Sequence, residues 1–472
     1  MITLDFVSGL DWKKQLSFDN KKYLINDNAS IREALLKLEE NHNGLILTCN
    51  GSGKVVGLAT DGDIRRALLK GIELDDKIGN CVNRNFVFAS TEFSREQLIK
   101  RLDGHIKFIP ILNKTGKLHS IVSKDYLPLD SEKSTYIRAR APVRVSFGGG
   151  GSDLTHYFEH NSGAVINTAV SIYSHGVMKV RRDSKIIINS LDLRGTLKAR
   201  DLDHALSQKG KFGLIQSLLH VVRPNYGFEL FLRSDFPIGS GLGGSATLSA
   251  VVLGCLNMMR EDQWNQHELA EIAFQAERLH LGIAGGWQDQ YAAVFGGFNF
   301  IEFHMDENII NPIRVHPDIA LELEESLVLC DTGLNHHSGS IHDHQKKTMN
   351  LKSIQEMVKA NVELTFETRN HLLRGNLERF GKCLDAAWKL KRNFSDLITN
   401  DYIDTIYSGA LDHGASGGKL LGAGGGGFFI FYVTPFQRHN LLEYLESKNL
   451  KTHPFKFEPD GLKAWVARDN TN

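Results

Sequence analysis

Apolar positions in the first 130 residues switch between two periodicities, and the switch occurs twice. Residues 30–43 (SIREALLKLEENHN) place apolar side chains every three to four positions, as an amphipathic helix does. Short apolar runs at 44–50 and 55–60 flank the turn GSGK and predict two strands, and 61–71 predict a second helix. The same order returns about sixty residues later, at 94–105, 106–113, 118–123 and 124–127. We therefore expect an internal duplication.

A short polar stretch separates this region, residues 1–130, from the rest of the chain. Residues 131–136 (SEKSTY) have the composition of a linker. After it, alternating strand patterns such as 136–147 mix with long helical patterns such as 265–282, up to residue 472. This mixture predicts an α+β domain in two lobes. We place the lobes at 137–310 and 311–472.

Composition and charge exclude several classes of protein. Lysine plus arginine number 55 and aspartate plus glutamate also number 55, so nothing indicates a nucleic-acid or polybasic membrane partner. No apolar run approaches the ~20 residues of a membrane span, and the first residues lack the order of a secretory signal. The five cysteines contain no C-x-x-C pair, which is typical of reduced thiols. We expect a cytoplasmic protein that binds neither nucleic acid nor membrane.

A glycine-rich loop, PIGSGLGGSA at 237–246, lies between a strand pattern at 226–236 and a buried helix pattern at 245–259. The first N–H groups of a helix have no intrahelical partner and carry a partial positive charge. Glycine lets such a backbone approach a phosphate closely. The loop therefore favours an anion cradle, with an ordinary tight turn as the alternative. It has neither the G-K-[ST] of a P-loop nor the G-x-G-x-x-G of a dinucleotide fold.

Two further glycine loops occur in the same domain. Gly148–Gly151 follow a strand pattern and are closed by Asp153, and a run at 422–427 precedes an apolar strand pattern. Three such loops in one domain suggest that they share a crevice.

The three loops resemble, in order, the motifs of the GHMP kinases, the superfamily of galactokinase, homoserine kinase, mevalonate kinase and phosphomevalonate kinase. The matching segments are 140–154, 237–246 and 422–427. Segments 277–299 and 414–428 are similar to the heptose 7-phosphate kinase subfamily. The resemblance implies a two-lobed fold, with an N-lobe like domain 2 of ribosomal protein S5 and an α/β C-lobe.

The same resemblance implies a reaction. With ATP and Mg²⁺, a protein of this subfamily would phosphorylate the anomeric hydroxyl of D-glycero-D-manno-heptose 7-phosphate. The product would be the 1,7-bisphosphate, for nucleotide-activated heptose and surface glycans. Kinases for L-fucose or galactose are the alternatives, as is an inactive nucleotide-binding regulator.

The resemblance also implies residue roles. Ser245 and Glu277 would bind Mg²⁺, and Asp289 beside Arg144 would orient or deprotonate the acceptor hydroxyl. Taken alone, Ser245 also fits a helix N-cap, Glu277 a solvated carboxylate and Arg144–Asp289 a structural ion pair. Expected at the nucleotide are Pro237, Gly239, Ser240, Gly241, Leu242, Gly243, Gly244, Ser245 and Ala246. Expected at the acceptor are Arg144, Gly149, Gly150, Ser152, Asp153, Asp289, Gly424 and Gly425.

A phosphate already on the acceptor requires a basic pocket. The segment 331–347 carries four histidines where subfamily members often have arginine and alanine, which leaves the exact sugar open. The spacing of His336, His337, His342 and His344 matches no standard metal site, so we expect a polar loop there. Candidates for the basic pocket are Arg181, Arg182, Lys389, Lys391, Arg392 and Lys419.

The duplicated front region resembles a pair of cystathionine-β-synthase-type (CBS) domains. In such domains a T-x-x-D element binds a nucleotide ribose, and here it would be Thr60 and Asp63. The second copy has Ser123 and Asp125, which are one residue closer together. The resemblance implies a regulatory nucleotide at Thr60 and Asp63. The alternative is a pair without ligand that joins subunits, and we expect a homo-oligomer.

Overall fold

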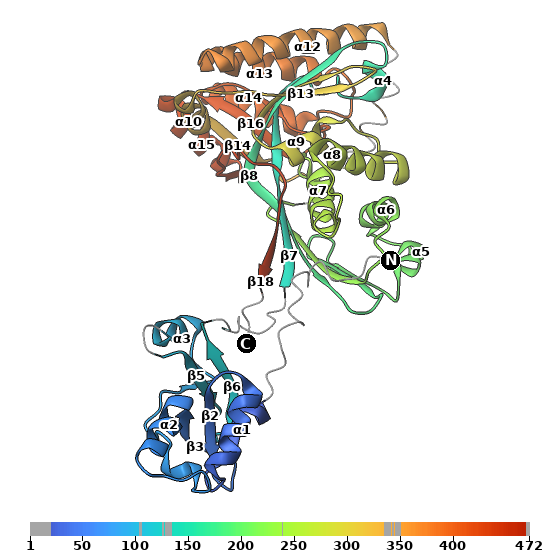
Figure 1. Ribbon diagram of the computed structural model, residues 1–472. Coiled ribbons are helices and arrows are strands. Elements are labelled where there is room, and N and C mark those ends of the chain that lie inside the picture. The colour runs from blue at the N-terminus through green and yellow to red at the C-terminus, as the bar shows by residue number, and fades with distance from the viewer. Residues whose placement is uncertain are drawn as a thin grey trace. The chain divides into compact units, whose positions relative to one another are not determined.

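The fold is taken from a computed structural model (Figure 1). It describes residues 20–102, 106–124, 127, 135–237, 239–334, 341, 344 and 351–468, without the side chain of Arg95. The chain divides into two compact units between residues 134 and 135, and each unit is described by itself.

The front unit contains the same small motif twice. In each copy the first strand pairs parallel with the second, and the second pairs antiparallel with the third. Three helices begin with capping boxes, at Ser30, Thr60 and Ser94, as the polar residues before each apolar pattern predict. The duplication expected from the sequence is therefore present. The elements are β1 (Leu24–Asn26), α1 (Ile31–Asn41), β2 (Leu45–Cys49), β3 (Val55–Thr60), α2 (Asp61–Leu69), β4 (Ala89–Ser90), α3 (Arg95–Arg101), β5 (Phe108–Leu112) and β6 (Leu118–Ser123).

The second unit is built on an eight-stranded sheet. Its path runs β10-β9-β11-β8-β12-β13, β7 pairs with β8, and β18 pairs with β7. All neighbours are antiparallel except β9 and β11. Thr135 and Tyr136, expected in the linker, are the first residues of β7 because they pair with β18. The strands are β7 (Thr135–Gly148), β8 (Gly163–Val180), β9 (Ile186–Ser190), β10 (Gly195–Ala199), β11 (Phe228–Ser234), β12 (Phe298–Phe303), β13 (Asn308–Pro312) and β18 (Lys463–Arg468).

A four-stranded antiparallel sheet, in the order β15-β16-β14-β17, forms the second layer of this unit. Helices α12 and α13 pack against each other, and α13 also packs on β15 (Figure 1). The expected lobe boundary at 310/311 falls inside β13, because Asn311 and Pro312 still pair with β12. The elements are α10 (Pro317–Ser326), β14 (Leu327–Asp331), α12 (Lys352–Leu373), α13 (Leu377–Lys391), α14 (Asp401–Asp412), β15 (Ala415–Leu420), β16 (Phe428–Val433), α15 (Arg438–Ser447) and β17 (Lys451–His453).

Helix α7 is buried almost all round, with apolar residues on every face of its last three turns. It packs on β7 and β8 and against α6, α8 and α9, so its N-terminus is held in a fixed place (Figure 1). The helices between β7 and β12 are α4 (Thr155–Phe158), α5 (Leu202–Ser207), α6 (Gly213–Val222), α7 (Gly244–Asn257), α8 (Gln266–Phe274) and α9 (Gln288–Phe295).

The cysteines and the helices can be compared with what the composition predicts. All five cysteines are free thiols, and Cys255, Cys330 and Cys383 are buried. Within the described residues, no helix has both the length and the apolar character needed to cross a membrane.

Candidate functional site

Two of the three glycine loops meet backbone to backbone, and the strand that leads into the remaining loop bonds to one of them. A Cβ on Gly422 would lie 2.6 Å from the Cα of Gly241, and a Cβ on Gly427 would lie 2.4 Å from the carbonyl oxygen of Ser240. The N–H of Arg144, on β7 four residues before Gly148, donates to the carbonyl of Leu242 at 3.3 Å. Glycine is required at these contacts because any side chain would push the loops apart. The shared crevice expected from the sequence is present.

The N-terminus of α7 opens into this crevice. Its N-cap is Gly243, at φ +81°, and neither a capping side chain nor an acidic residue occupies the first turn. The free N–H groups of that turn are thus available to an anion. Gly239 and Gly241 also have positive φ, which favours glycine at both positions.

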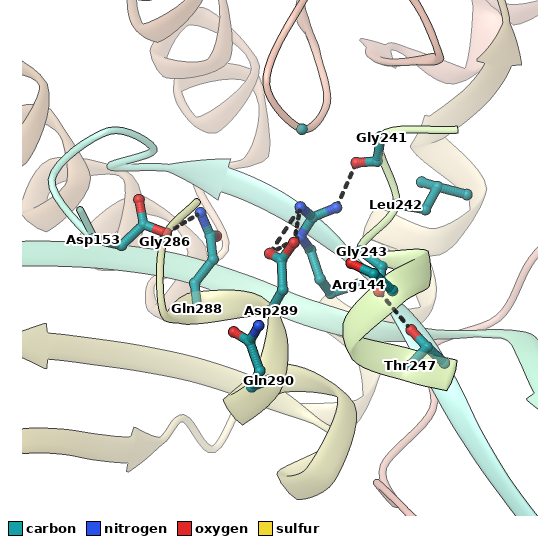
Figure 2. Close-up of polar contacts among 12 residues, drawn as sticks. Arg144, Asp153, Gly241, Leu242, Gly243, Thr247, Gly286, Gln288, Asp289 and Gln290 are labelled. Atoms are coloured by element: carbon teal, nitrogen blue, oxygen red, sulfur yellow. Dashed lines mark hydrogen bonds and ion pairs between the residues drawn. The ribbon is translucent and has the colours of Figure 1, made fainter. Parts of the chain in front are cut away.

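Arg144 and Asp289 form a two-point ion pair at the centre of the crevice (Figure 2). The guanidinium donates from Nε to Oδ1 at 2.8 Å and from Nη2 to Oδ2 at 2.9 Å. Its third contact, from Nη1, goes to the carbonyl of Gly241 at 2.5 Å. The arginine side chain is 5% exposed and the aspartate 21% exposed. Arg144 therefore couples the position of the Asp289 carboxylate to the loop at α7.

Asp153 is a second, fully enclosed carboxylate beside this pair. It accepts a hydrogen bond from the N–H of Gly151 at 3.0 Å. A second comes from Nε2 of Gln288 at 3.1 Å (Figure 2). Burial, and then the negative charge of Asp289, raise the pKa of Asp153. A Cβ on Gly286 would lie 1.9 Å from Oδ2 of Asp153, so glycine is required for this approach.

Ser245 and Glu277 also meet. The Ser245 hydroxyl donates to Oε1 of Glu277, and Nε2 of Gln290 donates to Oε2 at 2.8 Å. Glu277 lies on a π-helical turn, Gln275–His280, that continues α8, and such turns are frequent at functional sites. Among the described residues, no group of three or more His, Cys, Asp or Glu could hold a metal ion. One hydroxyl and one carboxylate fit Mg²⁺, which takes most of its oxygens from water and phosphate.

These groups line one cavity of about 640 Å³. Gly239, Ser240, Gly241, Gly243, Gly244, Ser245 and Gly150 are among its lining residues. The following predicted site residues do not line it: Pro237, Leu242, Ala246, Gly149, Ser152, Gly424 and Gly425.

For two of these residues, the structure explains why they do not line the cavity. The Ser152 hydroxyl serves the loop itself, because it donates to a backbone carbonyl and accepts from the N–H of Ala164. Leu242 is 0% exposed and belongs to the apolar core.

Two of the six basic candidates line the cavity, Lys391 at the end of α13 and Lys419 on β15. The other four lie outside its lining. Of these, Arg181 pairs with Asp183, Lys389 with Asp385 and Arg392 with Asp404. A lysine-rich stretch therefore separates into one cavity residue and solvent-facing ion pairs.

Several cavity residues were not predicted. Gln288 flanks Asp289 in the sequence, and a polar side chain on either side of a proposed catalytic aspartate was a signal that could have been used. Arg278, next to Glu277, places Nη1 3.2 Å from its Oε1. The apolar part of the lining carries no motif. It includes Phe212, Leu214, Ile215, Leu248, Leu281 and Ile283.

In the front unit, Thr60 and Asp63 bond to each other at the start of α2. The Thr60 hydroxyl donates to Oδ2 of Asp63 at 2.6 Å, and Nη2 of Arg66 donates to Oδ1 at 2.5 Å. Burial acts against ionisation, but the hydrogen bonds from Thr60 and Arg66 hold the pKa of Asp63 below its ordinary value. Asp125, like His336, His337 and His342, lies outside the described residues, whereas Nδ1 of His344 lies 2.8 Å from Oγ of Ser395.

Comparison with known families gives three matches along the chain. Residues 212–297 match the GHMP kinases N terminal domain, 370–451 the GHMP kinases C terminal domain, and 20–70 a CBS domain. The two kinase matches cover the α7 loop and the β15–β16 loop. The CBS match covers the first of the two front copies.

Individual proteins are also similar. A D-glycero-alpha-D-manno-heptose 7-phosphate kinase from Campylobacter jejuni is 34% identical over 335 residues, 70% of this chain and 98% of that protein. A bifunctional fucokinase/GDP-fucose pyrophosphorylase from Arabidopsis thaliana is 27% identical over 76% of this chain and 34% of that protein. A crystal structure of a D-glycero-D-manno-heptose 1-phosphate kinase from Bacteroides thetaiotaomicron superposes with a TM-score of 0.57 at 27% identity. The superposition covers 70% of this chain and 98% of the chain in that crystal structure.

Proposed function

Because the chain belongs to the GHMP kinase family and is a sugar kinase, we propose that it transfers the γ-phosphoryl group of ATP to a heptose 7-phosphate. The acceptor would be D-glycero-D-manno-heptose 7-phosphate, and the bond would form at its anomeric oxygen. The products would be the 1,7-bisphosphate and ADP, for nucleotide-activated heptose and surface glycans.

One observation carries this proposal: a carboxylate held in place by Arg144 faces the same cavity as the open N-terminus of α7. The uncapped N–H groups would hold the phosphates of ATP. Asp289 would orient the anomeric hydroxyl and accept its proton as the oxygen attacks phosphorus. Asp153 and Gly150 would contact the sugar. The cavity is large enough for both substrates, and its apolar end would take the base.

Mg²⁺ would be held by the hydroxyl of Ser245 and the carboxylate of Glu277, together with phosphate oxygens and water. When bound, it would neutralise charge on the phosphates. Glu277 accepts hydrogen bonds from Ser245 and Gln290 and lies beside the guanidinium of Arg278. That arrangement keeps the carboxylate oriented toward the loop.

L-Fucose is the second candidate acceptor, because the fucokinase match extends over 76% of this chain. Its test is shared with the first. With ATP and Mg²⁺, ADP formation is followed for heptose 7-phosphate, free heptose, fucose, galactose, mannose and homoserine. We expect kcat/KM for heptose 7-phosphate to exceed that of every other acceptor by at least about 100-fold. Fucose as the best acceptor would favour the second candidate, and no turnover with any acceptor would favour an inactive regulator.

We further propose that the front unit binds a nucleotide and adjusts kinase activity. The support is a hydroxyl and a carboxylate, Thr60 and Asp63, at the start of α2 within the CBS match. Calorimetric titration of the full chain with AMP, GDP or a GDP-sugar, with the kinase cavity saturated by a non-hydrolysable ATP analogue, should give heat. An absence of heat at millimolar ligand would leave a purely assembling role, in line with the expected homo-oligomer.

A further inference from the structure

Two lysines enter the cavity from the C-terminal part of the second unit. Lys391 is the last residue of α13 and is 6% exposed, and Lys419 is the last residue but one of β15 and is 2% exposed. Both line the cavity together with Arg144, Asp153 and Asp289. Lysines this deeply buried are rare unless they are paired with an anion.

Neither ammonium group has an anionic partner within the described chain. Lys391 donates to the carbonyl of Gly422, which is a neutral acceptor. Lys419 has no hydrogen bond or ion pair with any described residue. The two nearby carboxylates are otherwise engaged, because Asp289 is bonded to Arg144 and Asp153 to Gly151 and Gln288.

Among the described residues, no carboxylate is therefore free to pair with these two lysines. Arg144 and Asp289 pair with each other, and burial disfavours the charged form of Asp153, whose pKa is raised. Burial, and then Arg144, lower the pKa of Lys391 to about 8, while Asp153 and Asp289 oppose the shift. Burial, and then Lys391 and Arg144, lower the pKa of Lys419 well below its ordinary value, and a bound anion would favour the charged form of both lysines. An isolated buried charge is strongly unfavourable, so these lysines destabilise the ligand-free protein.

The position of the pair distinguishes between the two phosphates that a kinase of this kind would bind. The charges that act on the lysines are Arg144, Asp153 and Asp289, on the acceptor side of the cavity. Glu277, at the nucleotide side, is not among the charges that shift the pKa of either lysine most. A Cβ on Gly150, in the loop that would contact the sugar, would lie 3.9 Å from Nζ of Lys391.

We propose that Lys391 and Lys419 form a built site for a phosphoryl dianion, and that this dianion is the phosphate the acceptor already carries. The inference rests on the proposed function and deepens it, since it names the residues that distinguish a sugar phosphate from a free sugar. Two ammonium groups match the double negative charge of a phosphate monoester. The transferred γ-phosphate is the other source of the same chemistry, and the test separates the two.

The test uses Lys419→Met, which keeps the length of the side chain and removes its charge. We expect kcat/KM for heptose 7-phosphate to fall by about 10- to 100-fold, the value of a hydrogen bond to a charged group. The kcat/KM for free heptose should change less than about threefold, and the affinity for a non-hydrolysable ATP analogue should stay the same. Lys389→Met is the matched control, because that lysine is exposed and paired with Asp385. In this variant kcat/KM should change for neither heptose 7-phosphate nor free heptose.

Other outcomes overturn the assignment. An equal loss for both acceptors with weaker nucleotide binding would assign the pair to the γ-phosphate. No change in any constant would show that the pair binds no anion.

Thermal unfolding provides a readout that a purely structural lysine would not produce. Removing an unpaired buried charge should leave the Tm of ligand-free Lys419→Met equal to or above that of the original chain, while activity falls. A lower Tm with proportional loss of both activities would contradict the proposal.

A separate measurement keeps this inference distinct from the proposed reaction. Inorganic phosphate is titrated into the protein saturated with the ATP analogue. Binding to the original chain and loss of binding in Lys419→Met would support the anion site even if heptose 7-phosphate were not the acceptor. Equal binding of phosphate to both proteins would contradict the proposed anion site even if heptose 7-phosphate were the acceptor.

Discussion

Replacing Asp289 by asparagine should lower kcat by about 10²- to 10⁴-fold, the usual contribution of a positioned general base. Asparagine occupies nearly the same volume and can still accept a hydrogen bond from Arg144, but it cannot take up the proton of the acceptor hydroxyl. Affinity for a non-hydrolysable ATP analogue should change less than about threefold, because the proposed phosphate contacts come from the N-terminus of α7. Steady-state kinetics and calorimetry measure the two quantities.

The competing interpretation is that Arg144 and Asp289 form a purely structural ion pair. In that case Asp289→Asn would lower the Tm and leave kcat of the folded protein nearly unchanged. Asp235→Asn is the matched control, because Asp235 is also ion-paired, with His175 and Arg233, but does not line the cavity. It should alter stability alone.

Replacing Arg144 by lysine should lower kcat/KM by about 10²- to 10³-fold. The guanidinium makes three hydrogen bonds, two to Asp289 and one to Gly241, and lysine cannot reproduce this fork. Each lost bond to a charged group is worth about 1.5–3 kcal/mol, so two losses suffice for the expected effect. The Tm should also fall, since the carboxylate of Asp289 keeps only part of its pairing.

Arg140→Lys is the control for this change. Arg140 lies on the same strand and stacks 4.8 Å from the ring centroid of Tyr173, away from the cavity lining. It should retain full activity. If Arg144→Lys also retained full activity, the coupling of Asp289 to the nucleotide loop through this residue would be wrong.

The local parts of the site could be predicted from the sequence. Glycine runs, strand alternation and helical periodicity are short-range signals, and the segment 237–246 follows β11 and continues into the first turn of α7. Ser245 and Glu277 could be paired through the family resemblance, and in the structure they are bonded to each other. The π-helical turn that carries Glu277 follows no periodicity that distinguishes it from the α-helical pattern of 265–282.

Long-range placement could not be predicted. The last strand, β18, pairs with the first strand of its unit, β7. The sequence pattern of neither segment indicates which strand it pairs with. For the same reason six basic residues remained equivalent candidates until the fold placed Lys391 and Lys419 in the cavity. Lys419 did carry a local signal, because it is the only charged residue in the strand Ala415–Leu420.

Backbone contacts between loops were equally hidden. The glycines at 422 and 427 are required by their approach to Gly241 and Ser240, which a linear pattern does not show. Gly424 and Gly425, expected at the acceptor, lie outside the cavity lining, so this part of the glycine run makes a contact within the fold.

A crystal structure with a non-hydrolysable ATP analogue, Mg²⁺ and heptose 7-phosphate tests the central claim most directly. The account predicts the β- and γ-phosphates at the N-terminus of α7, the anomeric hydroxyl within hydrogen-bond distance of Asp289, and the 7-phosphate beside Lys391 and Lys419. A triphosphate bound elsewhere, with the N-terminus of α7 empty, would contradict it.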